Sequence, residues 1–279
     1  MPEGHVLHRI SHTLNAHLTG QVVRSSSPQG KFAAAEDVDG REFAGAEAYG
    51  KHLFVGFAGL EERVNIHLGL LGKFFFTDHH APEEIGAIRW RLSTEQPPWT
   101  MDLRGPNVCE LKSPTQVAAI TAALGPDPLR ADADPERAWE RIHRSGSPIA
   151  SLCMDQKIFA GVGNIYRAEA LYRHGIDPFM AGKFLRRHEF EALWDDFVEL
   201  MPLGVRDGRI DTVYPEHSPE ATGRAPRVDA HGGQVYVYRR AEQPCLVCGR
   251  PVSTQVLSGR NLFWCRTCQP RSRRRTVRG

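Results

Sequence analysis

Two features are missing from the sequence: a long hydrophobic run and a secretion leader. No stretch approaches the roughly 18 uninterrupted apolar residues that a membrane helix requires. The chain starts Met-Pro-Glu-Gly-His, without a basic segment followed by an apolar one. We therefore expect a cytoplasmic protein that does not contact a membrane.

An excess of one charge is also missing, since 35 Lys and Arg stand against 33 Asp and Glu. Hydrophobic residues make up 41% of the 279 residues, which excludes a disordered chain and a fibrous one. At about 100 to 200 residues per domain, the length predicts roughly two domains. The chain also lacks an internal repeat.

The net charge of +2 hides a polarity along the chain. Residues 236–279 contain ten Arg and a single acidic residue, Glu242, which gives +9, whereas residues 1–235 carry −7. A basic end of this kind is expected to contact a polyanion. For the arginines between residues 271 and 278, a merely solvated tail remains the alternative.

Cysteine is scarce, and four of the six cysteines form two Cys-x-x-Cys pairs. Each pair can wrap two thiolates around one ion, and two pairs complete a closed, tetrahedral zinc site of the structural kind. The alternative, four unrelated thiols, would leave the matched spacing to chance. Cys109 and Cys153 are expected to be small core residues. The predicted zinc ligands are Cys245, Cys248, Cys265 and Cys268.

Between the two cysteine pairs, residues 252–257 and 261–264 alternate as two strands would. Ser258, Gly259 and Arg260 stand where this hairpin turns, so its tip presents an arginine. A zinc hairpin too small for its own core and surrounded by Arg is more often a nucleic-acid contact than a catalytic metal site.

The hydrophobic period divides the rest of the chain into a strand-rich half and a helical half. Residues 3–19 predict an amphipathic helix, on which His5, His8, His12 and His17 are expected to form a solvated face. Short β-rich runs follow, which favour a sandwich or a barrel. They lie at residues 22–23, 32–35, 43–46, 52–57, 64–67, 73–77, 88–92, 99–103 and 108–111.

Helical periodicity returns at residues 115–124, and three prolines then interrupt it up to residue 135. Further helices are predicted at residues 136–143, 149–154, 165–174 and 187–201, followed by a long loop over residues 203–233. We therefore predict an α+β protein. Its expected parts are 1–125, a linker 126–135, a helical domain 136–234, a zinc hairpin 235–270 and a basic tail 271–279.

The segment from residue 155 to 169 combines a glycine turn with a helix start. Gly161 and Gly163 permit a tight turn, and Asn164 is expected to cap the helix 165–174. Exposed amides at such a helix start suit a phosphate. Most glycine turns before capped helices are only connections, so this segment alone leaves both interpretations open.

The start of the chain offers a possible nucleophile. Methionine before a small residue such as Pro2 is commonly excised, which would leave a secondary amine next to the carboxylate of Glu3. An α-amino group has a pKa of about 7.7 to 8, against about 10.4 for lysine, so part of it is uncharged and nucleophilic near neutrality. Many inert proteins begin in the same way.

Taken together, these motifs resemble one family, the formamidopyrimidine-DNA glycosylase/endonuclease VIII family of base-excision repair enzymes. The resemblance covers nearly the whole chain, with the motifs in the expected order. The matching segments are Pro2-Glu3-Gly4, Gly50-Lys51, His67-Leu-Gly-Leu-Leu-Gly72, Gly161-Val-Gly-Asn164, and Tyr238-Arg-Arg before four cysteines with Gly259-Arg260 between them.

The resemblance implies a fold and a partner. The expected fold is an N-terminal β-sandwich with flanking helices, then a helix-two-turn-helix domain that carries a zinc-finger β-hairpin. The expected partner is DNA with oxidised bases or abasic sites, bound by a monomer that holds one structural zinc ion. In a bacterium, such a protein would be associated with the nucleoid.

The resemblance also implies roles for single residues. Pro2 would be the nucleophile, Glu3 the acid and base, and Lys51 a charge near the lesion. Leu70 and Leu71 would fill the space of an extruded base, although two adjacent leucines are usually core residues. His67, Asn164 and Arg260 would hold phosphates, and Arg104 would face the orphaned base.

Two segments separate the branches of the family. Asp102-Leu-Arg104 matches the formamidopyrimidine branch, but Pro106 stands where that branch has an aromatic wedge. Residues 213–233 do not resemble that branch's cap over an oxidised purine. This favours the endonuclease VIII branch and oxidised pyrimidines.

Two other classes of function stay open. A catalytically silent lesion-binding protein would keep the DNA-binding elements with a blocked or retained Met1. A zinc-ribbon nucleic-acid adaptor would need only the C-terminal third, and the combination of Pro2, Glu3 and Lys51 argues against it.

Overall fold

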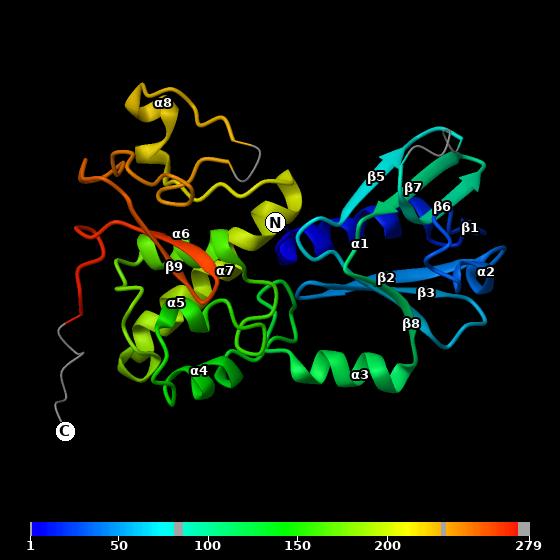
Figure 1. Cartoon of the computed structure of the whole chain (residues 1–279), viewed down its shortest axis with the longest axis horizontal. Helices are drawn as coiled ribbons and strands as arrows, with labels where there is room; N and C mark the ends of the chain where they lie inside the picture. The colour runs from blue at the N-terminus through cyan, green and yellow to red at the C-terminus, as the bar shows by residue number, and fades with distance from the viewer. Residues whose placement is uncertain (1, 81–85, 230–232, 273–279) are drawn as a thin grey trace. The chain divides into compact units, whose positions relative to one another are not determined.

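The computed structural model describes residues 2–80, 86–229 and 233–272. Residue 1, residues 230–232 of the predicted loop and residues 273–279 of the predicted basic tail lie outside the described residues. The chain forms two compact units, Met1–Ala123 and Leu124–Gly279, which are called unit 1 and unit 2 (Figure 1). No described helix combines the length and the apolar character needed to cross a bilayer.

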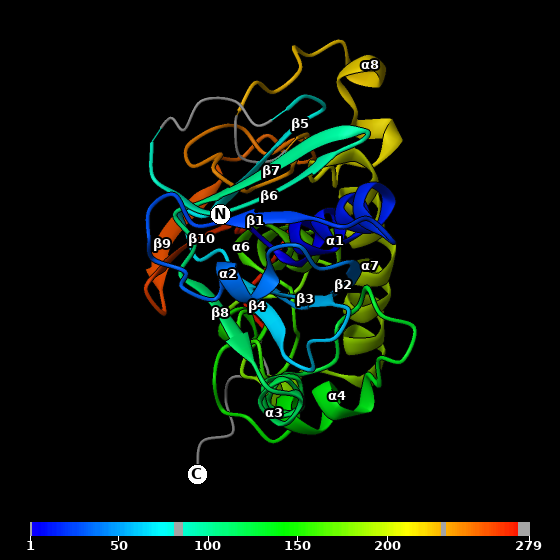
Figure 2. The ribbon, with the colours of Figure 1, turned by 90° about the vertical axis from the view of Figure 1, so that its right-hand side faces the viewer.

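Unit 1 contains two four-stranded antiparallel sheets, which confirms the predicted sandwich (Figure 2). All described pairs between neighbouring strands within these sheets are antiparallel. The first sheet has the order β1 (Arg24–Ser26), β6 (Ile88–Glu95), β7 (Pro98–Arg104) and β5 (Lys73–Thr77). The second has the order β2 (Phe43–Tyr49), β3 (His52–Phe57), β4 (Arg63–His67) and β8 (Val108–Lys112).

Helix α1 (Gly4–Leu18) packs against β2 through polar as well as apolar contacts. Ser11 Oγ donates to the Ala46 carbonyl at 2.8 Å, and the Asn15 side chain both donates to and accepts from the Ala46 backbone at 2.9 and 2.7 Å. The predicted solvated histidine face is wrong in part, because His5 and His8 are buried. The helix is therefore buried over a wider face than its apolar spacing predicted.

One of the predicted strands of unit 1 is wrong. Residues 32–35 form a turn that leads into a short helix, α2 (Ala35–Val38). Phe32, Ala35 and Val38 are buried at intervals of three residues, so the apolar run follows a helical and not a strand period. The run at residues 22–23 provides only an isolated bridge from Val22 to Glu42.

Helix α3 (Pro114–Ala123) ends unit 1, and the predicted linker region then begins inside unit 2. Leu124 and Asp127 are buried, and the Gly125 amide donates to the Gln156 carbonyl at 2.9 Å. A Cβ atom on Gly125 would lie 2.3 Å from the Ile158 carbonyl oxygen. Glycine is therefore required where this segment enters the second core.

Unit 2 is mostly helical and ends in a two-stranded hairpin. Its core combines aromatic residues of the long helix with the hairpin, as shown by the cluster that joins Phe159, Phe190 and Phe197 to Leu262 and Phe263. The main elements are α4 (Glu136–Ile142), α5 (Ile149–Leu152), α6 (Asn164–Arg173), α7 (Arg187–Asp207), α8 (Pro219–Thr222), β9 (Ser253–Leu257) and β10 (Arg260–Trp264). Two short 3₁₀ segments are η1 (Gly182–Phe184) and η2 (Pro215–His217).

The long helix α7 extends beyond its predicted end at residue 201. It contains Pro202 and continues to Asp207, because the buried stripe includes Met201 and Gly204. Gly208 then ends the helix with a left-handed φ of 70°. The predicted loop after it also contains η2 and α8, so the description of residues 203–233 as a loop was too simple.

Candidate functional site

One end of the second sheet of unit 1 collects several of the predicted site residues. Gly50, with a φ of 59°, and Lys51 form the two-residue turn between β2 and β3. His52 pairs with Tyr49 on one side and with His67, the last residue of β4, on the other. Lys51 and His67 therefore lie at the same end of the sheet, where Figure 1 also shows the start of α1.

The predicted nucleophile and its acid stand at that start of α1. Pro2 is partly exposed, whereas Glu3 is fully buried. Glu3 is the N-cap residue of the helix in extended conformation, and its carbonyl accepts from the Val6 amide at 3.0 Å. The backbone of Glu3 is thus held by the helix start, and the residue before it is a proline that solvent can reach.

The two histidines beside this turn are held in the neutral form. Burial lowers the pKa of His52, and burial together with the nearby His52 and Lys51 lowers the pKa of His67. The Gly69 amide donates to Nδ1 of His67 at 3.2 Å. The proton of the neutral imidazole is therefore on Nε2, which makes His67 a hydrogen-bond donor without a charge.

The loop that follows His67 presents two leucines to solvent. Leu70 is 55% exposed and Leu71 is 81% exposed, so the interpretation as core residues is wrong. The loop is tight: a Cβ atom on Gly72 would lie 2.4 Å from the Leu68 carbonyl oxygen. The Gly72 amide donates to that same oxygen at 3.0 Å. Two apolar side chains are thus projected from a closely packed turn.

Arg104 lies next to this loop, at the end of β7 and opposite Lys73 of β5. Arg104 donates to Oδ2 of Asp102 at 3.2 Å, and its guanidinium lies 4.9 Å from the centre of the Phe75 ring. Arg91 donates to Oδ1 of the same Asp102 at 2.6 Å. Burial alone would raise the pKa of Asp102, but its bonds to Arg91 and Arg104 lower it. The carboxylate therefore stays charged and orients both arginines.

Pro106 is buried and cannot act as a wedge. Phe75 is an exposed aromatic residue near the predicted site that the sequence analysis missed. Phe75 is 47% exposed beside Arg104. The signal was present in the run Lys-Phe-Phe-Phe-Thr, because successive side chains of a strand point to opposite faces and three consecutive aromatic rings cannot share one core.

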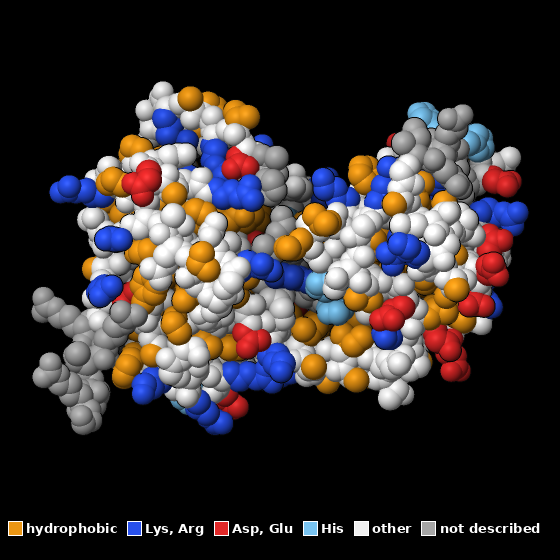
Figure 3. Space-filling view, viewed as in Figure 1, with side chains coloured by type: hydrophobic (Ala, Val, Ile, Leu, Met, Phe, Trp, Pro, Cys, Tyr) orange, Lys and Arg blue, Asp and Glu red, His pale blue; other side chains and the backbone are white. Residues whose placement is uncertain are grey.

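Acidic side chains gather at the opposite end of unit 1. The turn between β3 and β4 lies at the far end of these strands from Lys51, and α2 is tied to it through Arg41, which donates to the carbonyls of Asp37, Ala58 and Gly59. Figure 3 shows this acidic grouping on the visible face. The end with Lys51 and His67 is therefore kept clear of these carboxylates, which are those of Glu36, Asp37, Asp39, Glu61 and Glu62.

In unit 2, the predicted site residues outside the zinc ligands lie at the start of α6 and at the tip of the hairpin. The prediction that Asn164 caps α6 is wrong, since Gly163 is the N-cap residue and Asn164 is the first residue of the helix. Its Nδ2 donates to the Asn261 carbonyl at 3.0 Å, and its Oδ1 accepts from Arg167. Asn261 follows Arg260 directly, so two predicted phosphate contacts are brought together although they are far apart in sequence.

Arg167 is a further residue that the sequence analysis missed. Its side chain is fully buried and also donates to the carbonyls of Ala150 and Asn261, both at 3.3 Å. A buried guanidinium thus lies directly beneath Asn164. Its position three residues after Asn164 places it on the same side of the helix, but only the tertiary contact with Asn261 reveals that role.

The hairpin turns as predicted and exposes Arg260. Ser258 and Gly259 have left-handed φ values of 50° and 72°, and Arg260 pairs with Leu257 across the two-residue turn. The Ser258 hydroxyl lies 2.9 Å from the hydroxyl of Ser151 in α5. The hairpin tip is therefore held by a helix as well as by its own two strands.

The four cysteines form a geometry that fits one zinc ion. Their sulfur atoms all lie within 4.8 Å of one another, and the Cys245–Cys268 and Cys248–Cys265 pairs are 3.8 and 3.4 Å apart. Tetrahedral ligands at a Zn–S distance of about 2.3 Å are separated by about 3.8 Å. The Tyr172 hydroxyl lies 3.0 Å from Cys245 Sγ. Four thiolate ligands fill the coordination of one zinc ion, as in a structural site.

Three family profiles match the chain in order. Residues 1–108 match the formamidopyrimidine-DNA glycosylase N-terminal domain, residues 124–214 match the formamidopyrimidine-DNA glycosylase H2TH domain, and residues 242–271 match the zinc finger found in FPG and IleRS.

Among curated proteins, the chain is 47% identical to the proteins named Endonuclease 8 1 of Mycobacterium tuberculosis and Mycobacterium bovis, over 96% of this chain and 100% of each of those proteins. It is 31% identical to the formamidopyrimidine-DNA glycosylase of a Synechococcus species, over 74% of this chain and 72% of that protein.

Solved structures share the fold. The MutM (Fpg) protein of Thermus thermophilus has a TM-score of 0.75 at 25% identity, with 97% of this chain and 100% of that chain covered. The Lactococcus lactis Fpg, in a complex with DNA that contains an abasic site, has a TM-score of 0.77 at 20% identity, with 96% and 100% covered. By the near full-length match at 47% identity and the three profiles in order, the chain belongs to the formamidopyrimidine-DNA glycosylase/endonuclease VIII family, whose members are base-excision repair DNA glycosylases with AP lyase activity.

Proposed function

We propose that the protein excises oxidised pyrimidines from DNA through a Schiff base on Pro2 and then cleaves the strand by elimination. The observation that carries this proposal is the start of α1, where a partly exposed Pro2 precedes a fully buried Glu3. Membership of the family supports the same chemistry. The requirement is that Met1 is removed, because an amide nitrogen is delocalised and cannot form an iminium.

Base excision is assigned to Pro2 and Glu3. The Pro2 amine attacks C1′ of the damaged nucleotide, the bond from C1′ to the base breaks, and the departing base takes up the proton that the nitrogen loses. Glu3 protonates the ring oxygen of the sugar, so that the ring opens and an iminium links C1′ to Pro2.

Strand cleavage follows from the same intermediate. The iminium acidifies the hydrogens on C2′, and loss of one of them expels the 3′ phosphate by breaking the C3′–O3′ bond. Water then hydrolyses the iminium and restores the amine. Lys51, at the turn beside the start of α1, supplies a positive charge near the lesion.

The remaining residues are assigned to holding DNA. His67 donates from Nε2 to a phosphate. In unit 2, Asn164 and Arg260 bind further phosphates. Leu70 and Leu71 are exposed and fill the space of the extruded base, while Arg104 faces the orphaned partner. The Lactococcus lactis Fpg complexes, with DNA that contains an abasic site or an oxidised pyrimidine, support a lesion-bearing duplex as the ligand.

The preference for pyrimidines rests on two observations. The chain is 47% identical to proteins named Endonuclease 8 1, and 31% identical to a formamidopyrimidine-DNA glycosylase. The sequence of residues 213–233 does not resemble the formamidopyrimidine branch's cap over an oxidised purine, and the described part of this segment contains η2 and α8.

Borohydride trapping tests the proposal. The full-length zinc-loaded protein, shown by mass spectrometry to start at Pro2, is incubated with duplexes that carry an oxidised pyrimidine, an oxidised purine or an abasic site. We expect a covalent adduct at residue 2, formed faster with the oxidised pyrimidine than with the oxidised purine, whereas the abasic site needs no base excision before trapping. Pro2→Gly should lose most of the trapping, and Glu3→Gln should lose base excision but keep DNA binding.

A matched control separates these effects from loss of charge in general. Glu36→Gln removes an exposed carboxylate at the opposite end of unit 1 and should leave excision unchanged. An adduct on Lys51 would reassign the nucleophile. Neither adduct nor nicking in chains that start at Pro2 would instead support a catalytically silent lesion-binding protein.

A further inference from the structure

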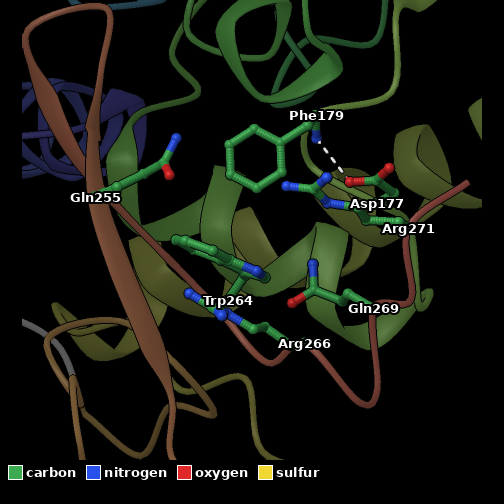
Figure 4. Close-up of a pocket in the computed structure, with 7 residues that line it drawn as sticks. All are labelled: Asp177, Phe179, Gln255, Trp264, Arg266, Gln269 and Arg271. Atoms are coloured by element: carbon green, nitrogen blue, oxygen red, sulfur yellow. Dashed lines mark hydrogen bonds between the residues drawn. The ribbon is translucent and has the colours of Figure 1, made fainter. Parts of the chain in front are cut away.

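A cavity of about 510 Å³ lies in unit 2, at the base of the zinc hairpin (Figure 4). Its lining comes from three segments: the loop after α6, the hairpin strands, and the second cysteine pair with the chain that follows it. None of the residues assigned to catalysis, phosphate contacts or zinc lines this cavity. Its volume falls within the range of about 300 to 1,000 Å³ that is typical of ligand sites.

Two polar residues of the lining are already used to hold its walls. Asp177 accepts from the amides of Phe179 and Ser272, at 3.0 and 2.9 Å. Gln269 is buried, accepts from the Cys265 amide at 3.0 Å and donates to the Ile176 carbonyl at 3.0 Å. These bonds connect the hairpin to the loop after α6, so the cavity is preformed.

Three other polar side chains of the lining are not used in this way. Within the described part of the chain, the side chains of Gln255, Arg266 and Arg271 make no hydrogen bond or ion pair. All three residues are exposed. The lining therefore offers two guanidinium groups and one carboxamide to a ligand, with Asp177 as its single acidic side chain.

Aromatic rings complete the lining. Phe179 and Trp264 lie edge to face, with ring centres 5.0 Å apart and an angle of 84° between the rings. The Arg266 guanidinium is 5.8 Å from the centre of the Trp264 ring. Figure 4 shows Gln255 and Arg271 on opposite sides of the Phe179 ring. A planar group and an anion can therefore be contacted at the same time.

We infer that this cavity binds a nucleotide. The base packs on the partly exposed ring of Phe179, with the buried Trp264 behind that ring, and its edge pairs with the Gln255 carboxamide. The phosphate lies between Arg266 and Arg271, because guanidinium groups bind phosphate with two parallel hydrogen bonds. An acidic peptide would meet the two arginines as well, but it would leave the aromatic rings and the carboxamide without a planar partner.

The same chemistry has two possible sources, a free nucleotide or a nucleotide of a DNA strand. Gln255 pairs with Leu262, two residues after Arg260 along β10, and Trp264 follows Arg260 by four residues. At a rise of about 3.3 Å per residue, these two residues of the lining lie about 7 and 13 Å from the hairpin tip. A strand that reaches from the tip to the cavity would add a contact outside the residues assigned to the lesion.

Titration calorimetry on the full-length zinc-loaded protein tests the inference. The probes are deoxyadenosine monophosphate, deoxycytidine monophosphate, deoxyadenosine without a phosphate, inorganic phosphate, and a short single-stranded oligonucleotide. We expect the mononucleotides to bind at least about tenfold more tightly than either the nucleoside or phosphate alone, because both parts of the ligand are recognised.

Variants connect binding to this cavity. Arg266→Ala combined with Arg271→Ala should weaken mononucleotide binding by about tenfold or more, and Phe179→Leu should weaken it as well. Arg250→Ala removes an exposed arginine of the same zinc region outside the cavity and should change nothing. Arg266 and Arg271 are exposed, so their double substitution should leave the fold intact. This variant therefore tests the inference even if Phe179→Leu destabilises the protein.

The outcomes separate the sources and the alternatives. The oligonucleotide is measured in proteins that also carry Arg260→Ala. If the paired arginine substitutions weaken the binding of the oligonucleotide as much as that of the mononucleotide, the site belongs to a DNA strand. If they weaken only the binding of the mononucleotide, the site belongs to a free nucleotide. No mononucleotide binding, binding that the paired arginine variant retains, phosphate binding as tight as nucleotide binding, or preference for an acidic peptide would each overturn the inference. None of these readouts depends on glycosylase activity.

Discussion

The buried guanidinium of Arg167 connects Asn164 to the hairpin residue that follows Arg260. This group donates to Asn164 Oδ1 and to the Asn261 carbonyl, while Asn164 Nδ2 donates to that same carbonyl. Because Oδ1 accepts from Arg167, the amide of Asn164 is held with its NH₂ group at the Asn261 carbonyl, and the second N–H of that group is left for a phosphate. Arg167 therefore positions a donor for phosphate and does not itself reach the surface.

Substitution of Arg167 tests this positioning role. We expect Arg167→Met to weaken DNA binding by about 1 to 2 kcal/mol, because it removes the bond that orients Asn164. Arg167→Lys should weaken binding too, since an ammonium group cannot reproduce the planar fork that spans three carbonyl oxygens. Filter binding across salt concentrations measures both effects, with zinc content and melting temperature as checks on folding.

The salt dependence distinguishes position from charge. Arg260→Ala should make the slope of log K against log salt shallower by about one unit, whereas the Arg167 variants should lower affinity at a nearly unchanged slope. Full recovery of binding in Arg167→Lys would show that the charge alone matters and would reject the positioning role.

His5 makes the stability of unit 1 sensitive to acid. Burial, with smaller contributions from Arg9 and His8, lowers the pKa of His5 from 6.5 to about 4. Between these values the unfolded chain binds more protons than the folded one, so stability falls as the pH drops through this window and is fully present above about 6.5. The change from pH 7 to pH 5 should cost about 2 kcal/mol.

Denaturant unfolding at pH 7 and pH 5 measures this cost. His5→Gln should lose most of the difference between the two pH values, while His12→Gln, an exposed histidine on the same helix, should keep it. An unchanged pH dependence in His5→Gln would assign the acid sensitivity to other groups.

At the scale of elements, helix α6 supports the zinc hairpin at several points along its length. Its first residue, Asn164, bonds to Asn261 near the hairpin tip. In its middle, the fully buried carboxylate of Glu169 accepts from three consecutive amides of residues 236–238, at 2.6, 2.9 and 2.8 Å. The segment that enters the first cysteine pair is thereby fixed to the helix that starts at the proposed phosphate contact.

Tyr172 provides the third point, at the metal ligands themselves. Its hydroxyl lies 3.0 Å from Cys245 Sγ and 3.8 Å from Cys268 Sγ. Burial and the two cysteines raise the pKa of Tyr172, so the hydroxyl stays protonated and donates to the sulfur atoms. Hydrogen bonds of this kind orient metal ligands and strengthen binding.

Tyr172→Phe should therefore release zinc about tenfold faster to a chelator, because the thiolates lose a donor while the ring packing is kept. Tyr214→Phe serves as the matched control, since within the described residues its hydroxyl makes no hydrogen bond. A colorimetric zinc assay follows the release. Equal rates in the two variants would show that Tyr172 only fills space.

The sequence predicted those elements whose signals are local. Alternating side chains indicated most strands of unit 1, and paired cysteines indicated the zinc site, because both patterns depend on neighbours in the chain. The end of α7 was not predictable in this way: Pro202 is usually a helix breaker, but burial of Met201 and Gly204 continues the helix past it.

The details of the candidate site depend on contacts that the sequence does not show. Asn164 is of a residue type that is typical of N-cap positions, but its side chain donates to the carbonyl of Asn261, 97 residues away. The exposure of Leu70 and Leu71 follows from the close packing of Gly72 against Leu68, which no periodicity indicates. Residue types could thus be chosen from motifs, whereas their orientation comes from tertiary packing.

At the scale of the whole molecule, the chain has two separate hydrophobic cores. One cluster is built from residues of unit 1, and the other from residues of unit 2. The zinc ligands Cys245 and Cys265 and the hairpin residues Leu262, Phe263 and Trp264 belong to the second cluster. The metal is therefore connected to the packing of α6 and α7 and not to that of the sandwich.

Removal of zinc should consequently destabilise unit 2 while unit 1 stays folded. Without the ion, the hairpin has two strands and no core of its own, so its buried residues leave the second cluster. Hydrogen exchange with and without chelator, or in Cys265→Ala, should show lost protection in β9, β10 and residues 236–238, with protection in β6 and β7 unchanged. DNA affinity should fall in parallel, because Arg260 and Asn261 lose their place beside Asn164. Equal loss of protection in β6 and β7 would show that the two cores unfold as one, and unchanged affinity in a verified zinc-free protein would remove the hairpin from the DNA contact.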